Sequence, residues 1–262
     1  MECPLCQAEL SRKVFDGSFY TLNICLNCGS NFQARYGEPV ITYEEDYFKT
    51  GHLKTYGKTY IDDEWNIREI AKRRLRILVK MLPPGGRILD IGSAMGLFCN
   101  EAVKMGLKPE GVEISDYARD FSSRAFKLKV WQDLSEISGD FDAVSLWFTL
   151  EHMQEPLSWI KKASSFLNER GIIALSVPNS VGAFPRFNPT AYYLKRPEEH
   201  YFEPSPGAMI SVLKTNGFHL ERLEFFGLHP ERAGLPSIGI IKIIQKLIGL
   251  GDTFEIYARK LY

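Results

Sequence analysis

Four cysteines in two close pairs could bind a metal ion. Cys3 and Cys6 form one pair and Cys25 and Cys28 the other, with eighteen residues between the pairs. Zn2+ takes four soft donors in a tetrahedron, and two C-x-x-C turns supply four thiolates when a hairpin brings the turns together. A site closed by four thiolates predicts structural rather than catalytic zinc. Two disulfides or four unbound thiols are the alternatives.

The segment between the two pairs has the residues that such a hairpin needs. Val14–Phe15 and Phe19–Leu22 are expected strands on either side of the turn signal Asp16-Gly17-Ser18. Gly29 suits the tight turn that directs backbone N–H groups at the sulfur atoms. The fifth cysteine, Cys99, lies alone in an expected helix and is predicted to be a small core residue.

A glycine-containing loop could bind a cofactor. It runs from Asp90 to Gly96, between an expected strand at 87–91 and an expected helix at 97–105. The crevice at such strand ends binds cofactors in doubly wound sheets. Glu113 ends the next strand, 23 residues after Asp90, at the spacing of carboxylates that bind ribose hydroxyls. Two of the three glycines of a nicotinamide site are missing, which disfavours a dinucleotide.

Two histidines lie where a general base would be useful. His152 follows the strand expected at 141–147, and His200 precedes the helix expected at 205–216. Either side chain could deprotonate an acceptor near neutral pH. The alternative for each is a buried or capping histidine that holds a loop.

Alternating strand and helix patterns must position these residues. Strands are expected at 87–91, 109–114, 129–131, 141–147, 172–177, from 218, and at 253–260; helices are expected at 65–81, 97–105, 115–126, 156–168 and 205–216. Ser115 is expected to cap its helix. The alternation predicts an α/β fold with a doubly wound, Rossmann-like parallel sheet, preceded by the small zinc-ribbon hairpin.

Taken together, the motifs resemble those of class I S-adenosylmethionine-dependent methyltransferases. The matching segments are Asp90–Gly96, Gly111–Ser115, Gln132–Leu134, Phe141–His152 with Pro156, and Gly171–Asn179. Ala94 replaces the middle glycine of the first motif, a departure that is mild where the backbone φ angle is negative. The resemblance covers about Ile61 to Lys260 and implies a seven-stranded, mostly parallel sheet.

The resemblance also implies which residues hold S-adenosylmethionine. The expected contacts are Asp90, Gly92, Ser93, Ala94 and Gly96 for the methionine part, Glu113 for the ribose, and Asp133 and Leu134 for the adenine, with Ile114 and Trp147 to complete the set. For Asp133, a solvated loop acid is the alternative.

The pair Glu151-His152 resembles one in ubiquinone-biosynthesis O-methyltransferases. In that family a carboxylate three residues earlier assists metal binding. Phe148 takes that position here, which argues against a catalytic metal ion. The expected catalytic residues are therefore Glu151, His152 and His200.

Two further segments suggest how an acceptor or partner is bound. Residues 178–204 show no clear periodicity but are rich in aromatic and basic side chains, and are expected to form the acceptor-binding wall. In 238–250, Ile240, Ile241, Ile244, Leu247 and Ile248 share one helical face, with Lys242, Gln245 and Lys246 on the other. Packing on the sheet or in a homodimer is one interpretation, and contact with a membrane or lipid-linked substrate is the other.

Composition limits the function classes. The 32 basic residues balance the 32 acidic ones, and six acidic residues but no Lys or Arg lie between Trp131 and Pro156. Both observations disfavour a polyanion partner such as nucleic acid. Neither a signal peptide nor a stretch apolar enough to span a bilayer is visible, so a cytoplasmic protein is expected.

The predicted organisation is a zinc-ribbon module at 1–38, an aromatic linker or lid at 39–64, and a methyltransferase domain at 65–262. We expect methyl transfer to a small-molecule acceptor, on a hydroxyl oxygen of a sugar, glycolipid or secondary metabolite. The alternatives are an RNA methyltransferase whose ribbon docks RNA, and a non-catalytic cofactor-binding scaffold that recruits a partner.

Overall fold

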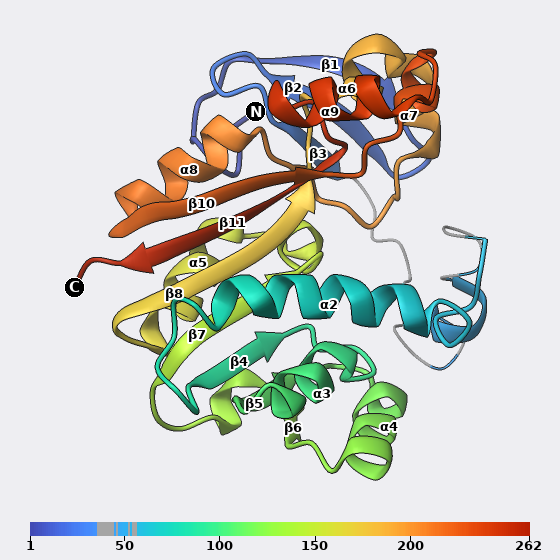
Figure 1. Cartoon of the computed structure of the whole chain (residues 1–262). Coiled ribbons are helices and arrows are strands. Elements are labelled where there is room, and N and C mark those ends of the chain that lie inside the picture. The colour runs from blue at the N-terminus through green and yellow to red at the C-terminus, as the bar shows by residue number, and fades with distance from the viewer. Residues whose placement is uncertain (36–44, 46, 52, 54–56) are drawn as a thin grey trace. The chain divides into compact units, whose positions relative to one another are not determined.

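The computed structural model describes residues 1–35, 45, 47–51, 53 and 57–262 (Figure 1). The chain divides into two compact units. One comprises Met1–Val40, Phe148–Ala163 and Ala174–Tyr262, and the other comprises Ile41–Trp147 and Ser164–Ile173. Much of the predicted linker at 39–64 lies outside the described residues. Along the described part of the chain, no helix is both long and apolar enough to cross a membrane.

A seven-stranded sheet has the order β10-β11-β8-β7-β4-β5-β6. Its strands are β4 (Arg87–Ile91), β5 (Lys108–Val112), β6 (Val130–Trp131), β7 (Phe141–Trp147), β8 (Leu167–Pro178), β10 (Phe218–Phe226) and β11 (Thr253–Lys260). β4 pairs in parallel with β5 and β7, and β5 with β6, whereas β10 and β11 are antiparallel. The predicted mostly parallel, Rossmann-like sheet is confirmed. Successive strands are added on opposite sides of β4, so a topological switch point lies between β4 and β7.

Three helices accompany the first strands. They are α2 (Glu64–Leu78), α3 (Leu97–Lys104) and α4 (Asp116–Phe126). Ser115 caps α4 as predicted, because its hydroxyl oxygen accepts a hydrogen bond from the Ala118 N–H. Before α2, the one-turn helix η1 (Tyr47–Gly51) brings Phe48 into a buried cluster with Met95 and Ala118.

The cysteine-containing hairpin belongs to a second, four-stranded sheet with the order β1-β2-β3-β9. β1 (Ser11–Asp16) and β2 (Tyr20–Cys25) are the predicted hairpin. β3 (Asn31–Arg35) and β9 (Phe202–Glu203) were not predicted from the sequence. The missed strands pair with each other, with Asn31 opposite Glu203 and Phe32 opposite Phe202. A two-residue strand has no periodicity of its own, so only tertiary pairing reveals β9.

Short helices fill the segments between the later strands. The elements are η2 (Leu134–Glu136), η3 (Leu150–His152), α5 (Pro156–Ser165), α6 (Ala183–Phe187), α7 (Pro189–Lys195), α8 (Pro206–Thr215), η4 (Pro230–Ala233) and α9 (Gly239–Leu247). Residues 178–204, expected to be irregular, contain α6, α7 and β9. Two helices of five and seven residues are too short to show helical periodicity. Phe184 and Tyr192 of this segment are buried.

The helix α9 does not pack its predicted apolar face on the sheet, and one residue of its predicted polar face is buried. Gln245, assigned to the polar face, is buried, and its side-chain amide donates to the Leu250 carbonyl at 2.9 Å. Ile240, Ile243, Ile244 and Leu247 are exposed instead. The amide anchors the end of the helix through this hydrogen bond, and the apolar face points outward.

Candidate functional site

The four paired cysteines form a cluster with the dimensions of a zinc site. All four sulfur atoms lie within 4.8 Å of one another. The Cys3 and Cys28 sulfurs are 3.7 Å apart and those of Cys6 and Cys25 are 3.5 Å apart. A tetrahedral ion with Zn–S bonds of about 2.3 Å requires sulfur–sulfur distances of about 3.8 Å. Disulfides, at about 2.05 Å, are excluded by these distances. The donor set therefore fits Zn2+.

Hydrogen bonds join the second cysteine turn to the chain around β9. The Ser205 hydroxyl donates to the Cys28 carbonyl at 2.6 Å, and the Ser205 N–H donates to the Ser30 hydroxyl at 3.1 Å. The Ser180 hydroxyl donates to the carbonyl of Gly29, whose positive φ of 74° confirms the predicted tight turn. The cysteine cluster and the segment that carries His200 are thus linked within one compact unit.

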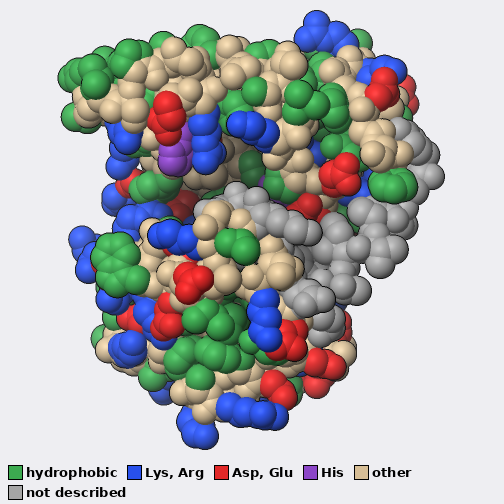
Figure 2. All heavy atoms as spheres, turned by 90° about the vertical axis from the view of Figure 1, so that its right-hand side faces the viewer, with side chains coloured by type: hydrophobic (Ala, Val, Ile, Leu, Met, Phe, Trp, Pro, Cys, Tyr) green, Lys and Arg blue, Asp and Glu red, His purple; other side chains and the backbone are tan. Residues whose placement is uncertain are grey.

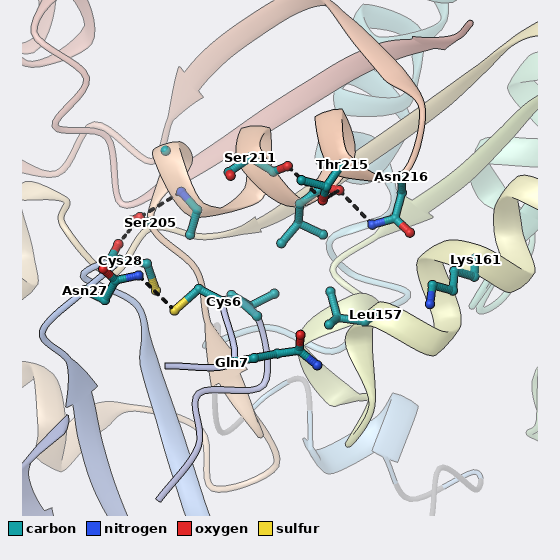
Figure 3. A pocket seen from close by; sticks show the side chains of 14 residues that line it. Cys6, Gln7, Asn27, Cys28, Leu157, Lys161, Ser205, Ser211, Thr215 and Asn216 are labelled. Atoms are coloured by element: carbon teal, nitrogen blue, oxygen red, sulfur yellow. Dashed lines mark hydrogen bonds between the residues drawn. The ribbon is translucent and has the colours of Figure 1, made fainter. Parts of the chain in front are cut away.

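A cavity of about 790 Å3 lies beside the cysteine cluster (Figure 3). Cys6, Gln7 and Asn27 line it from the cysteine turns, and residues of α5 and α8 line it elsewhere. In the close-up, the Asn27 amide points to the Cys6 sulfur, to which it donates at 3.5 Å. None of the residues that the sequence analysis assigned to methyl transfer lines this cavity.

Asp90 is a buried carboxylate at the end of β4. The neighbouring strand β7 places Ser145 opposite it, and the Ser145 hydroxyl donates to the Asp90 carboxylate at 2.6 Å. The Cys99 thiol also donates to this carboxylate, at 3.8 Å. Burial raises the pKa of Asp90 to about 7, against the hydrogen bond from Ser145 and the positive charge of Arg74. Cys99 is buried, as predicted, but it also contacts a candidate site residue.

Glu113 and the glycine-containing loop are joined by hydrogen bonds. The Glu113 carboxylate accepts from the Ala94 N–H at 2.8 Å and from the Ser115 N–H at 3.0 Å. Burial raises its pKa, and these backbone donors oppose that effect. Ala94 has a φ of 46°, so the expectation of a negative φ is wrong. The hydrogen bond to Glu113 stabilises this left-handed backbone, which costs an alanine about 1–2 kcal/mol.

The loop also presents a polar atom that could contact a ligand. The Ser93 hydroxyl is buried and has no hydrogen-bond partner among the described residues. A Cβ atom at Gly111 would lie 2.5 Å from this hydroxyl, so the glycine makes room for it. A buried hydroxyl without a partner is costly unless a ligand or water completes it. The loop therefore fits a polar cofactor.

The remaining predicted cofactor residues lie on three elements. Asp133 caps η2 and accepts from the Ser135 N–H at 2.8 Å, while Leu134 is buried. Ile114 is exposed at the end of β5. Trp147 ends β7, where its ring lies 5.4 Å from that of Phe98 and 4.2 Å from the Arg74 guanidinium carbon.

Glu151, His152 and His200 come together although 48 residues separate the two histidines. Their possible ligand atoms lie within 4.8 Å of one another, so the three could also hold a cation. The two imidazole rings meet edge to face, with centroids 4.9 Å apart. Burial lowers the pKa of His152 to about 3, and His200 adds to the effect. His152 is therefore a weak base.

A buried ion pair orients His200. Glu203 is buried, and its carboxylate lies 2.9 Å from the His200 Nδ1 atom and 3.0 Å from the Arg196 Nε atom. The Tyr192 hydroxyl donates to the same carboxylate. Burial alone would raise the pKa of Glu203, but Arg196 and His200 outweigh it and lower the pKa to about 2. The carboxylate fixes one nitrogen of the imidazole and leaves the Nε2 atom as the remaining donor or acceptor.

With this geometry established, the chain can be compared with known proteins. A family model described as a methyltransferase domain matches residues 63–223. The chain belongs to this methyltransferase family. The match includes the glycine-containing loop, Glu113 and the Glu151-His152 pair.

Individual relatives agree with this assignment. The methyltransferase is 30% identical over 117 residues to a ubiquinone biosynthesis O-methyltransferase of Xanthomonas campestris pv. campestris (strain B100), a match covering 41% of this chain and 49% of that protein. The corresponding protein of Xanthomonas axonopodis pv. citri is 27% identical over 161 residues, with 55% and 67% covered. The chain thus spans about half the length of the first of these relatives.

Solved structures show the same fold. A S-adenosylmethionine-dependent methyltransferase from Archaeoglobus fulgidus matches with a TM-score of 0.58 and 22% identity, covering 80% of this chain and 98% of that one. Magnesium protoporphyrin IX methyltransferase from Synechocystis PCC 6803, with bound S-adenosylhomocysteine, matches with a TM-score of 0.57 and 16% identity, covering 82% and 97%. The predicted resemblance to class I methyltransferases is confirmed.

Several residues of the methyltransferase were missed from sequence. Arg74 and Ser145 act on Asp90, and Arg196 and Tyr192 act on Glu203, whose carboxylate contacts His200. Ser145 lies within a recognised strand, so parallel pairing with β4 could have indicated it. The partners of His200 lie in a segment without periodicity, where the sequence gave no comparable signal.

Proposed function

We propose that the protein transfers the methyl group of S-adenosylmethionine to a hydroxyl oxygen of a small-molecule acceptor. The observation that carries this proposal is the loop Asp90–Gly96, whose buried Ser93 hydroxyl lacks a partner, in a chain of the methyltransferase family. The named relatives, which are ubiquinone biosynthesis O-methyltransferases, favour oxygen as the attacked atom. A sugar, a glycolipid or a secondary metabolite remains the expected acceptor.

The cofactor, when bound, supplies a methyl group already activated by a sulfonium centre. Asp90, Gly92, Ser93, Ala94 and Gly96 would hold its methionine part, Glu113 the ribose, and Asp133 and Leu134 the adenine, with Ile114 and Trp147 completing the set. The Glu113 carboxylate accepts from the backbone N–H groups of Ala94 and Ser115, and with about four lone-pair sites a carboxylate keeps capacity for a ribose hydroxyl. This dual role supports Glu113 as both loop anchor and ligand contact.

We propose His200 rather than His152 as the general base. The Glu203 carboxylate orients the His200 ring through its Nδ1 atom, so the Nε2 atom can take a proton from an acceptor hydroxyl. His152 packs against the His200 ring and, with its low pKa, is a poor proton acceptor. Glu151 would assist by its buried charge. A cation held by Glu151, His152 and His200 is the competing mechanism.

The cysteine cluster is proposed to hold one structural Zn2+. Its role would be to fix the ribbon to which β9 is added, and with β9 the residue Glu203. Thiolates that bind zinc stay reduced, which favours the cytoplasm as the place of action. The proposed partner is the small-molecule acceptor rather than nucleic acid, while the exposed face of α9 suits either a lipid surface or a second copy of the chain.

An acceptor screen with methyl-labelled S-adenosylmethionine tests the function. Sugars, lipid-linked glycans, phenols and RNA are offered in parallel, and label transfer to a small-molecule hydroxyl is expected. Steep salt-dependent RNA binding with label in RNA would instead identify an RNA methyltransferase. Tight cofactor binding without transfer to any acceptor would identify a scaffold.

The cofactor assignment has its own matched test. Glu113→Ala should abolish S-adenosylmethionine binding in calorimetry, because the loop loses its anchor and the ribose its carboxylate. Glu110→Ala, three residues earlier on β5, removes ion pairs with Arg87 and Lys129 and a hydrogen bond from Trp131 but no loop contact, and should retain binding. Unchanged affinity in the Glu113 variant would contradict the assignment.

A further inference from the structure

The helix α9 exposes an unusually apolar surface. Ile240, Ile243, Ile244, Leu247 and Ile248 recur at helical spacing on one face, and Leu247 is 80% exposed. The residue types would ordinarily be buried, whereas the polar Gln245 on the opposite face is only 4% exposed. The amide of Gln245 holds the helix in this orientation through the Leu250 carbonyl. The outward apolar face is therefore built into the fold.

Neighbouring elements extend this surface. η4 precedes α9 and packs against α6, and the Asn188 amide donates to the Arg232 carbonyl at 3.3 Å. Phe187 and Leu194, at the ends of α6 and α7, are also exposed, as are Leu235 and Ile238 ahead of α9. Figure 2 shows hydrophobic side chains gathered along the upper rim, the level at which Figure 1 draws α6, α7 and α9. We call these four exposed side chains, together with the five of α9 and its C-terminal end, the α9 surface.

Basic residues accompany the α9 surface. Within 183–196 and 230–248 the exposed or half-exposed charges are Arg186, Lys195, Arg232, Lys242 and Lys246 against the single acid Glu231. Two of them have acidic neighbours outside these segments, since Lys246 lies 3.5 Å from Glu224 and Arg232 lies 3.5 Å from Asp252. The other basic residues of these segments, Arg186, Lys195 and Lys242, still outnumber Glu231, so the surface carries net positive charge although the whole chain has none.

We propose that the α9 surface docks on a lipid bilayer that contains anionic headgroups. Exposed Ile, Leu and Phe side chains beside Lys and Arg are the composition of a helix that lies in the membrane interface. A second copy of the chain is a poorer occupant, because a twofold-symmetric interface would bring two positively charged surfaces together. Anionic lipid complements both the apolar and the basic residues.

Co-sedimentation with vesicles tests this proposal on the full chain, with its bound zinc. Vesicles of phosphatidylcholine alone are compared with vesicles that also contain phosphatidylglycerol. The protein should sediment with the anionic vesicles, and binding should weaken as salt is raised. The double variant Ile243→Ser/Leu247→Ser should bind at least tenfold more weakly, and its fold should persist because both side chains are exposed.

Controls separate the possible results. Val103→Ser removes an exposed apolar side chain of α3 and should bind vesicles as the unchanged protein does. Lys242→Glu should weaken binding to anionic vesicles only. Equal binding to both vesicle types, equal binding by the double variant, or no binding at all would overturn the proposal. A different result would also overturn it: the protein is a dimer by light scattering, the double variant is a monomer, and neither binds vesicles. None of these measurements requires methyl transfer, so failure here is distinct from failure of the proposed activity.

Discussion

Replacing Asp90 by asparagine tests whether this carboxylate is retained at the expense of stability. The side chain is completely buried, and its pKa is about 7 against an ordinary value of 3.8. The difference is about 3 pKa units, and each unit corresponds to ~1.4 kcal/mol. Ionised Asp90 therefore destabilises the folded protein by about 4 kcal/mol relative to the unfolded chain. Asparagine has nearly the same shape, keeps an oxygen that can accept from Ser145, and carries no charge.

The direction in which stability changes with pH follows from how tightly each state binds the Asp90 proton. The folded state holds the Asp90 proton more tightly than the unfolded chain, so stability falls as the pH rises from about 4 to about 7 and then levels off. Between pH 5 and pH 8 the free energy of unfolding of the unchanged protein should fall by about 3 kcal/mol more than that of Asp90→Asn. The variant should thus be the more stable protein at pH 8, even though a proposed cofactor contact has been altered.

Urea denaturation at pH 5 and pH 8 measures the effect. The difference between the two proteins is the relevant quantity, because it cancels the contribution of Asp252, whose pKa burial raises to about 6. Asp140→Asn, at an exposed position, serves as the matched control and should give the same difference at both pH values. If Asp90→Asn is no more stable than the unchanged protein at pH 8, burial does not dominate the energetics of this carboxylate.

Four further results are expected. Elemental analysis should find one zinc ion per chain. The Cys25→Ser variant should lose this ion and the Cys99→Ser variant should keep it. A second metal ion per chain would indicate a cation at Glu151, His152 and His200. Glu203→Gln should lower the free energy of unfolding by about 3–5 kcal/mol in urea denaturation, because it leaves Arg196 buried without its counter-charge; the exposed Glu198→Gln should change it by less than about 0.5 kcal/mol. Ala94→Gly should raise the free energy of unfolding by up to about 1 kcal/mol, since glycine accepts a positive φ; a loss would mean that the packing of the Ala94 methyl group against the Phe48 cluster outweighs the strain. Once an acceptor is known, His200→Ala should reduce kcat for methyl transfer far more than His152→Ala, and the opposite order would exchange their roles.

The parts of the fold that repeat a strong local pattern were predictable. The bounds expected for β7 and β11 agree with the structure, because each is an apolar or alternating run with clear ends. The cysteine turns were predictable because metal ligation demands one spacing. The orientation of α9 was not predictable, because helical periodicity identifies an apolar and a polar face but does not tell which of the two is buried. In the structure the face with Gln245 turns inward, where the Gln245 amide donates to the Leu250 carbonyl.

The candidate site was predictable only where residues follow strands. Asp90 and Glu113 stand at strand ends, so topology alone places both at the same edge of the sheet. Arg196, Tyr192 and Glu203 act on His200 through tertiary contacts in a segment without periodicity. The backbone of Ala94 was not predictable either. Its positive φ angle accompanies the hydrogen bond from its own N–H to Glu113, a tertiary contact that the sequence does not reveal.

The pairing of β3 with β9 has a consequence for how the chain matures. Asn31 leaves the ribosome 172 residues before its partner Glu203. At about 5–20 residues per second, the edge of β3 waits roughly 10–30 s for that partner. An unpaired strand edge can recruit another chain, so nascent chains that stop short of β9 are the species at risk of aggregation. Synthesis of the last quarter of the protein therefore closes a sheet that the first tenth began.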